Sequence, residues 1–333
     1  EAPIKYGTTI LYSAFAVYGL RFRFGLESLH ISKLETIYML GFIPLEVYKE
    51  LIADYVLGQR FQFLSLMITS IYCAVGIFYV WLKFCWIAFI KEELIPVYKW
   101  LWRREQNRLK SKLIADNSEP WQKEFGKKGE GLRYIGGLDI STSLYDNGCA
   151  CACFVILSYP ELEIVHQETA AVVIDRPYIA GYLAFREAES LAALIARVRR
   201  THPDIFPQII LIDGNGILHP QRFGLASHIG VLADVPTIGV AKNLHHMDDL
   251  VKYDDRSAKA NRRALITDDG TVLGEAVCAT SDAKNPVFVS IGHRITLDTA
   301  VAVVSRCSKY RVPEPTRLAD QISRQLVRQW WDN

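Results

Sequence analysis

The sequence predicts an α/β protein whose mixed sheet is flanked by helices, with a hydrophobic helical segment in front of it. From about residue 132 onwards, short apolar runs separated by turn residues come first and then alternate with helical patterns, an order typical of a mixed sheet. Before residue 98 the chain is instead rich in apolar and aromatic residues. We therefore expect two domains, residues 1–97 and 98–333.

Periodicity places the elements of the second domain. Three adjacent strands are expected at RYIGGLDIS (133–141), CACACFVILS (149–158) and LEIVHQETAAVVI (162–174), and YDNG (145–148) is a hairpin-type turn between the first two. A helix is expected over 185–200, because its leucine, isoleucine and valine residues fall on one face. Further strands are expected at 208–213, 236–242 and 287–293, and further helices at 223–234 and 297–309.

Composition excludes some classes of protein. The net charge of +2 neither requires nor excludes a polyanionic partner. The seven cysteines show no Cys-x-x-Cys pair and no histidine at finger spacing, which argues against a disulfide framework and a zinc finger. The period-2 run CACAC (149–153) puts three small thiols on one face of a strand, and we expect them to be packing residues.

The first domain contains a candidate membrane span. FLSLMITSIYCAVGIFYVWL (63–82) has twenty residues without a charge, which satisfies the length of roughly 20 residues for a spanning helix, and the apolar character continues to residue 90. The alternative is a hydrophobic core helix. The chain does not begin with Met, so we expect a fragment, a processed product or an incomplete gene model. Two weaker candidate spans are 8–20 and 37–48.

The segment KWLWRREQNRLKSK (99–112) holds six basic residues against one acid. Three interpretations stay open. After a membrane span, the cluster would lie on the cytoplasmic side. At the start of a soluble domain, it could form a basic helix that contacts phosphates. It could equally be an ordinary solvated helix face.

Three acids occupy positions where a site is expected. Asp139 interrupts the first strand, Glu187 lies in the first turn of the helix that follows, and Asp213 ends a buried strand. Active groups of α/β sheets gather where strands end and helices begin, and three carboxylates there would make an oxygen site for Mg²⁺ or Mn²⁺. Each acid also has a structural interpretation, as a surface strand residue, a charge at a helix N-terminus, or a turn or capping residue respectively.

Other candidates lie at strand ends and in one loop. Lys242 closes the strand PTIGVAK, and His293 closes VFVSIGH. A histidine in such a place is more often structural than catalytic. The loop RPYIAGY (176–182) presents Tyr178 between a strand and a helix, either as a core residue or as an aromatic wedge against bases.

The motifs of the second domain resemble those of one family. GGLDIS, PYIAGYLAFRE, LIDGNGILHPQRFGLASHIGVL, PTIGVAK, SIGHRITL and YRVPEPTRLAD occur in the same order and at similar spacing as in the endonuclease V family, over about residues 100–325. WRREQNRLKSK and SYPELEIV resemble the animal forms. The resemblance implies a ribonuclease H-like fold, a monomeric nuclease domain, and hydrolysis of the second phosphodiester on the 3′ side of inosine, leaving 3′-hydroxyl and 5′-phosphate ends.

The resemblance also implies roles for individual residues. Asp139, Glu187 and Asp213 match the metal-site carboxylates, Lys242 a catalytic lysine near the scissile phosphate, and His293 a histidine at the far side of the metal site. The wedge matches Pro177, Tyr178, Ile179 and Ala180. The base pocket matches Gly181, Leu183, Gly214, His219 and Leu225.

The chemistry suits these residue types. Mg²⁺, or Mn²⁺ in its place, can activate water and neutralise charge on the phosphate, while Lys242 orients the water or stabilises the charge. A displaced base in a glycine-lined pocket would let backbone groups tell hypoxanthine from adenine and guanine. The expected partner is inosine-containing single-stranded RNA, with deoxyinosine DNA as a second substrate. The expected location is the cytoplasm and the nucleus or nucleolus.

Residues 1–97 lie outside this resemblance and resemble a multi-span eukaryotic membrane protein. Two explanations account for this combination. Two neighbouring genes were merged in the gene model, or the nuclease is tethered through residues 63–90 and located at a membrane. The missing start Met favours the merged model. Two other functions stay open. One is a module that binds inosine-containing RNA without cleaving it, and the other is a membrane protein whose soluble tail is incidental.

Overall fold

The structure is a computed structural model that describes residues 59–89, 94–128, 131–143, 148–244, 246–251, 262–280, 283 and 285–332. The chain divides into two compact units, Glu1–Leu94 and Ile95–Asn333. The predicted turn at 145–148 falls almost wholly outside the described residues.

The described part of the first unit is a helix, α3 (Gln59–Phe89), which contains the uncharged run 63–82. Among the described residues, no helix combines the length and the apolar character needed to cross a bilayer. The membrane span expected at 63–82 therefore finds no support, and neither does membrane contact through 63–90. The weaker candidates at 8–20 and 37–48 lie outside the described residues.

The second unit is built on an eight-stranded mixed sheet with the order β3-β2-β1-β4-β5-β8-β7-β6. β1, β2 and β3 form an antiparallel meander, β4 and β5 run parallel to β1, and β8, β7 and β6 are antiparallel again. This confirms the mixed sheet expected from the sequence. The strands are β1 (Tyr134–Thr142), β2 (Cys149–Ser158), β3 (Ile164–Val173), β4 (Ile209–Asp213), β5 (Thr237–Ala241), β6 (Arg262–Ile266), β7 (Val272–Val277) and β8 (Val287–His293).

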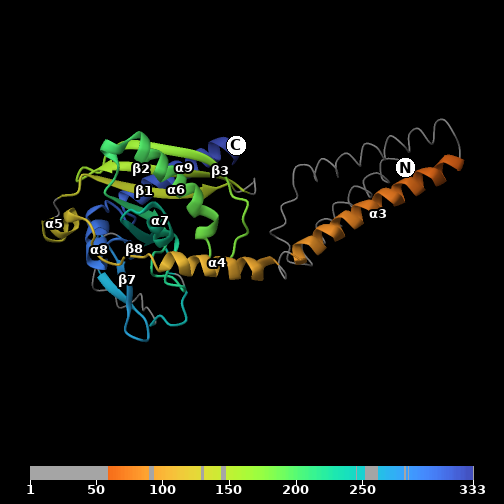
Figure 1. Cartoon of the computed structure of the whole chain (residues 1–333). Coiled ribbons are helices and arrows are strands. Elements are labelled where there is room, and N and C mark those ends of the chain that lie inside the picture. The colour runs from red at the N-terminus through yellow and green to blue at the C-terminus, as the bar shows by residue number, and fades with distance from the viewer. Residues whose placement is uncertain are drawn as a thin grey trace. The chain divides into compact units, whose positions relative to one another are not determined.

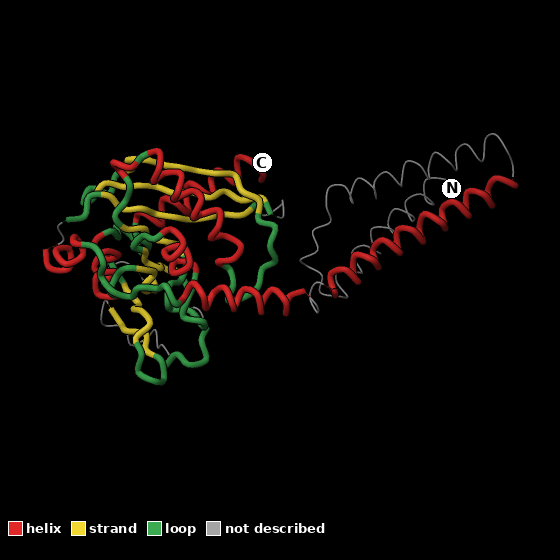
Figure 2. Tube along the Cα trace, viewed as in Figure 1, coloured by secondary structure: helices red, strands yellow, loops and turns green. Residues whose placement is uncertain are grey.

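Helices cover both faces of this sheet (Figures 1 and 2). One face packs against α6 and α7 through a core that includes Phe154, Leu191 and Ile210. The other face packs against α5, α8 and α9, with Ile135 and Val301 in one cluster and the last helix over β1 and β2. The helices of this unit are α4 (Ile95–Lys110), α5 (Pro120–Lys128), α6 (Ala184–Thr201), α7 (Leu225–Ala233), α8 (Leu297–Arg306) and α9 (Glu314–Val327), with short turns η2 (Pro203–Ile205) and η4 (Arg328–Asp332).

The thiols of CACAC behave as packing residues. Cys151 and Cys153 are fully buried on β2, and Cys153 packs with Val155 against Ala319 of α9. Burial raises the pKa of the Cys151 thiol to about 11, so this side chain is a neutral apolar group.

The close approach of α9 to β1 depends on one glycine. A methyl group added to Gly137 would lie 1.9 Å from the carbonyl oxygen of Pro315, in the first turn of α9. Real carbon–oxygen contacts do not approach this distance, so only glycine lets the helix backbone lie against the strand at this point. Gly137 therefore sets the position of α9.

We expect Gly137→Ala to lower the free energy of unfolding by about 2 kcal/mol or more, because α9 must move away from the sheet. Urea unfolding of the full chain measures this loss. Gly270→Ala is the matched control: its added methyl group meets nothing within 4 Å, and only the positive φ of +84° costs about 1 kcal/mol. Equal losses in the two variants would contradict the steric role.

His228 of α7 is a buried titratable group in the core beside α4. Its ring is 4 % exposed and lies between Phe185, at 4.9 Å, and Phe223, at 5.7 Å. Burial lowers the pKa of His228 to about 4, only partly opposed by the charge of Glu105. The folded protein therefore holds this imidazole neutral at pH 7.

Lowering the pH should reduce the free energy of unfolding, because His228 is protonated in the unfolded chain before it is protonated in the folded protein. Between about pH 6.5 and pH 4 the unfolded chain binds a proton at this histidine that the folded chain does not, so stability falls as pH falls through that window. At pH 5 the loss is about 2 kcal/mol relative to pH 8. His228→Leu should lose that much less on the same pH change in urea unfolding. Other titrating groups are common to both proteins, so identical pH slopes would contradict the assignment.

Candidate cation-binding site

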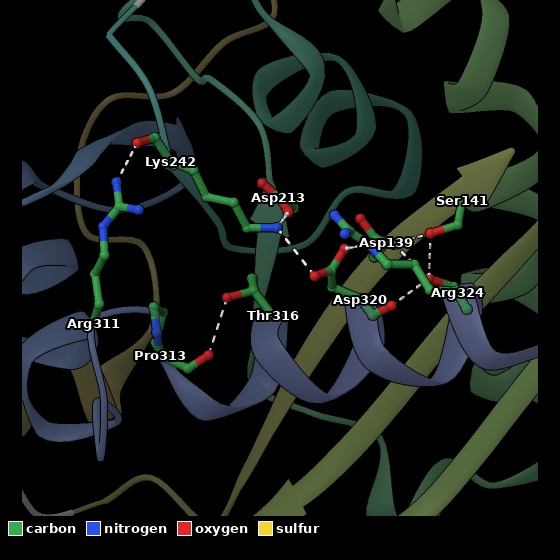
Figure 3. A network of polar contacts seen from close by, with 10 residues as sticks. Asp139, Ser141, Asp213, Lys242, Arg311, Pro313, Thr316, Asp320 and Arg324 are labelled. Carbon is green, nitrogen blue, oxygen red and sulfur yellow. Dashed lines mark hydrogen bonds and ion pairs between the residues drawn. The ribbon is translucent and has the colours of Figure 1, made fainter. Parts of the chain in front are cut away.

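Three aspartates meet at the carboxyl ends of β1 and β4. Asp139 lies on β1, and Asp213 is the last residue of the adjacent parallel strand β4. Asp320 comes from α9, which packs on the face of the sheet to which Asp139 and Asp213 point (Figure 3). One carboxylate oxygen from each of the three lies within 4.8 Å of the others.

Lys242 links two of these carboxylates. It follows β5 directly, and its Nζ lies 2.6 Å from Asp213 Oδ2 and 3.2 Å from Asp320 Oδ2. Burial opposes the charge of Lys242, but its hydrogen bond to Asp213 and the charges of both acids outweigh burial and raise its pKa. The lysine is therefore a stable ammonium group. Arg311 donates to the backbone oxygen of Lys242 at 2.5 Å and so fixes the turn that carries it (Figure 3).

Asp139 is held by the hydroxyl groups of two serines. Ser323 Oγ of α9 donates to Asp139 Oδ2 at 2.6 Å, and Ser141 Oγ lies 2.7 Å from Ser323 Oγ. Burial, together with the charges of Asp213 and Asp320, raises the pKa of Asp139 to about 6, against the lowering effect of Ser323. The serine contacts orient the carboxylate. A positive charge beside it would favour its ionised form.

Asp320 was not singled out from the sequence, although it lies in the motif YRVPEPTRLAD. Its Oδ1 accepts a hydrogen bond from Arg324 at 2.7 Å, one helical turn later, while Oδ2 faces Lys242. The local pattern gives no signal, because an acid paired with an arginine four residues on is typical of a solvated helix face. Only the packing of α9 on β1 shows that Asp320 faces the other carboxylates.

Glu187 approaches the cluster from the other face of the sheet. It lies in the first turn of α6, which packs opposite α9. Burial, together with the charges of Asp139 and Asp213, raises the pKa of Glu187 to about 7. Glu187 therefore interacts electrostatically with Asp139 and Asp213. Its carboxylate is not one of the three that lie within 4.8 Å of one another.

The structure does not bring His293 to the carboxylates. β8 is antiparallel to β5, so His293, at the end of β8, pairs with Thr237 at the start of β5, whereas Lys242 follows the end of β5. Its Nδ1 accepts a hydrogen bond from the backbone N–H of Ile114 at 3.2 Å. The structure therefore places His293 at the opposite end of β5 from Lys242, and its role at the metal site stays a prediction.

The predicted wedge forms an exposed loop before α6. The side chain of Tyr178 is 65 % exposed, and the guanidinium of Arg186 lies 5.8 Å from its ring. Pro177 and Ala180 are at least partly exposed, while Ile179 is buried and anchors the loop. The tyrosine is thus free to contact another molecule.

The predicted pocket residues lie in two loops that approach each other. Gly181 has a positive φ of +82°, and a methyl group there would lie 3.3 Å from Gln221 Oε1. Gly214 faces Leu225, which is buried, and His219 accepts a hydrogen bond from the backbone N–H of Gln221. Leu183 is 39 % exposed. The loop that carries Tyr178 and Gly181 therefore meets the loop that follows Asp213 at Gln221.

The donor set fits a hard divalent cation. Three aspartates offer only oxygen atoms, which Mg²⁺ and Mn²⁺ prefer. Lys242 offsets part of their charge through its contacts with Asp213 and Asp320, which leaves three carboxylates facing one ammonium group. Asp139, Asp213 and Asp320 would therefore hold such an ion.

The fold and this site define an α/β enzyme with an acidic cation-binding centre. Residues 117–321 match the family model of endonuclease V. The chain therefore belongs to the endonuclease V family, whose members are nucleases. Residues 1–84 match a different model, that of the ALG6, ALG8 glycosyltransferase family.

Individual relatives agree with this assignment. Endonuclease V of Mus musculus is 42 % identical over 235 residues, covering 68 % of this chain and 69 % of the mouse protein. The Homo sapiens protein is 41 % identical over 235 residues and 83 % of it is covered. The catalytic domain of human endonuclease V superposes with a TM-score of 0.67 at 41 % identity, covering 72 % of this chain and 97 % of that domain. Ciona intestinalis endonuclease V, solved with DNA containing an inosine followed by a ribo-adenosine, gives 0.65 at 35 % identity, covering 72 % and 98 %.

Removing the Ser323 hydroxyl should weaken cation binding without unfolding the protein. Ser323→Ala removes the shorter of the two serine hydrogen bonds to Asp139, and losses of about 10- to 100-fold in metal affinity are typical when such a partner is removed. Calorimetric titration with Mn²⁺ measures the affinity. Ser308→Ala is the control, since Ser308 bonds only the backbone oxygen of Val304. Unchanged Mn²⁺ affinity in Ser323→Ala would contradict the orienting role.

Proposed function

We propose that the chain is a metal-dependent endonuclease that hydrolyses the second phosphodiester on the 3′ side of inosine in single-stranded RNA, leaving 3′-hydroxyl and 5′-phosphate ends. Deoxyinosine in DNA would be a second substrate. The observation that carries this proposal is the cluster of Asp139, Asp213 and Asp320 with Lys242 at the ends of parallel strands. Membership of the endonuclease V family and the strand order β3-β2-β1-β4-β5, which fits a ribonuclease H-like fold, support it.

The residues of the site have separate tasks in this reaction. Mg²⁺ held by the three aspartates would supply an activated water and neutralise charge on the phosphate. Lys242 is protonated, so it donates hydrogen bonds and stabilises developing negative charge rather than removing a proton. Ser323 and Arg324 keep Asp139 and Asp320 in place, and Arg311 does the same for Lys242. Glu187 adds negative potential from the α6 side.

Base selection would use the loops next to the wedge. Tyr178 is exposed and could fill the gap left by a displaced base. Gly181 and Gly214 carry no side chain that would cover the backbone against an approaching base. Hypoxanthine lacks the exocyclic amines that distinguish adenine and guanine. The choice of RNA over DNA rests on similarity to the animal relatives and on the ribo-adenosine that follows inosine in the Ciona complex.

Residues 1–97 have no catalytic role in this proposal. The three aspartates and Lys242 all lie in the second unit, and the endonuclease V match begins at residue 117, beyond the separate match over 1–84. A soluble, fully active chain that starts near residue 95 would agree with this, and loss of activity on removing the segment would contradict it.

In this proposal Asp320 and His293 contribute differently to cleavage. Asp320→Asn should abolish cleavage of a single-inosine RNA oligonucleotide in Mg²⁺, as should Asp213→Asn, because a charged ligand is lost. His293→Asn should keep cleavage within about 10-fold of the parent, because it acts at the other end of the strands. Circular dichroism checks that each variant folds. A dead His293→Asn beside an active Asp320→Asn would reverse the assignment.

Matched oligonucleotides test the substrate. Inosine RNA, deoxyinosine DNA and adenosine RNA of the same sequence are incubated with the chain and Mg²⁺, and the product ends are analysed. Inosine-dependent retention without any product would instead favour a binding module. The closely spaced aspartates argue against that second function, because binding alone does not require three converging carboxylates.

A further inference from the structure

A basic groove lies beside the base-pocket loops and is not part of the carboxylate site. It runs between α4 and the loop before α7, is open to solvent, and has a volume of about 280 Å³. We call it the α4 groove, and it is lined by Arg103, Asn107, Lys110, Pro220, Gln221 and Arg222. α4 lies outside the residues that match the endonuclease V family model.

Part of the basic charge of α4 lies on one stripe of the helix. Lys99, Arg103 and Lys110 recur with Asn107 at intervals of three and four residues, all exposed. The neighbouring stripe of Trp102, Gln106 and Leu109 is buried. This stripe therefore borders the packed seam, whereas Arg104 and Arg108 lie on another side of the helix.

The walls of the groove are fixed. Gln106 Nε2 donates to the backbone oxygen of Phe223 at 2.8 Å in a buried contact, which ties α4 to the loop. Lys110 Nζ donates to the backbone oxygen of Gln221 at 3.1 Å. Figure 1 shows α4 running alongside α7, where these contacts form. A ligand would meet a preformed surface.

The groove carries positive charge that the protein does not neutralise. Arg222 pairs with Asp249, and its charge is therefore offset. Within the described part of the chain, no acidic side chain lines the groove or pairs with Arg103 or Lys110. Glu105 pairs with Arg108 on another side of the helix. Arg103 and Lys110 are thus left as cations that face open solvent.

The groove continues into the segment that carries the wedge. Gln221 in its wall borders Gly181, directly after the wedge residues. The apolar side of α4 packs under the same loop, where Trp102 clusters with Ile179 and stacks on Phe185 at 5.2 Å. A nucleic-acid strand whose base enters the neighbouring pocket would have its next phosphates within reach of this surface.

We propose that the α4 groove binds the sugar–phosphate backbone of the substrate strand beside the displaced base, with Arg103 and Lys110 as the phosphate contacts. This inference rests on the proposed function and adds a binding surface to it. A strand fits better than an isolated anion, because the two cations lie about 10 Å apart along the axis of α4, too far for one small anion to contact both, on a groove that is open along its length.

The test compares two double variants of the full chain that remove equal charge from the same segment. Arg103→Gln/Lys110→Gln removes the groove cations, and Arg104→Gln/Lys112→Gln removes two exposed cations that do not line the groove. Affinity for a labelled single-inosine RNA is measured at several salt concentrations, with Ca²⁺ in place of Mg²⁺. The groove variant should bind about 10-fold more weakly, with a salt slope shallower by about 1.4, as expected for two lost single-strand phosphate contacts.

Two further measurements separate this inference from the proposed function. Single-turnover cleavage at subsaturating RNA should fall in the groove variant in proportion to its affinity for RNA, and shortening the RNA on one flank should weaken binding by the parent but not by the groove variant. If the two double variants lose equal affinity for RNA while the parent still prefers inosine RNA over adenosine RNA, the role of the α4 groove is overturned and the proposed function stands. A parent that shows no inosine preference would overturn the proposed function and the groove with it.

Discussion

The main constraint on the site is that three carboxylates, which repel one another when ionised, must stay within 4.8 Å of one another. Their mutual repulsion in a partly buried place would favour protonation or separation, as the raised pKa of Asp139 indicates. Lys242 offsets part of this charge through contacts with Asp213 and Asp320. The remaining negative charge would attract a cation to the three carboxylates. A fold that holds these groups rigidly is therefore a condition for function.

Rigidity comes from packing rather than from the polar contacts themselves. β1 and β4 are adjacent parallel strands in the middle of the sheet, so Asp139 and Asp213 are fixed by backbone hydrogen bonds. Asp320 is positioned only through α9, whose approach to the sheet requires Gly137. The same helix supplies Ser323 to Asp139. The contact between α9 and β1 thus positions Asp320 directly, and it positions Asp139 indirectly through Ser323.

Local sequence patterns predicted the parts of the site that depend on local structure. Apolar runs that end on Asp213 and before Lys242 marked the ends of parallel strands, which do lie together. His293 also ends an apolar run, but strand direction cannot be derived from such a run, and β8 is antiparallel. Asp320 looked like an ordinary helix surface acid, because its role follows from a contact between segments 180 residues apart. The strands β6 and β7 and the helix α9 likewise were not expected from the sequence.

The order of the site residues along the chain has a consequence for synthesis. Asp139, Asp213 and Lys242 all precede Asp320, which lies in α9, after every strand of the sheet. A nascent chain still missing α9 could pair its central strands but would lack one aspartate, Ser323 and the cover over β1. The carboxylate cluster therefore closes only after translation has passed this helix. Until then the growing polypeptide cannot assemble the complete centre beside the messenger RNA from which it is being made.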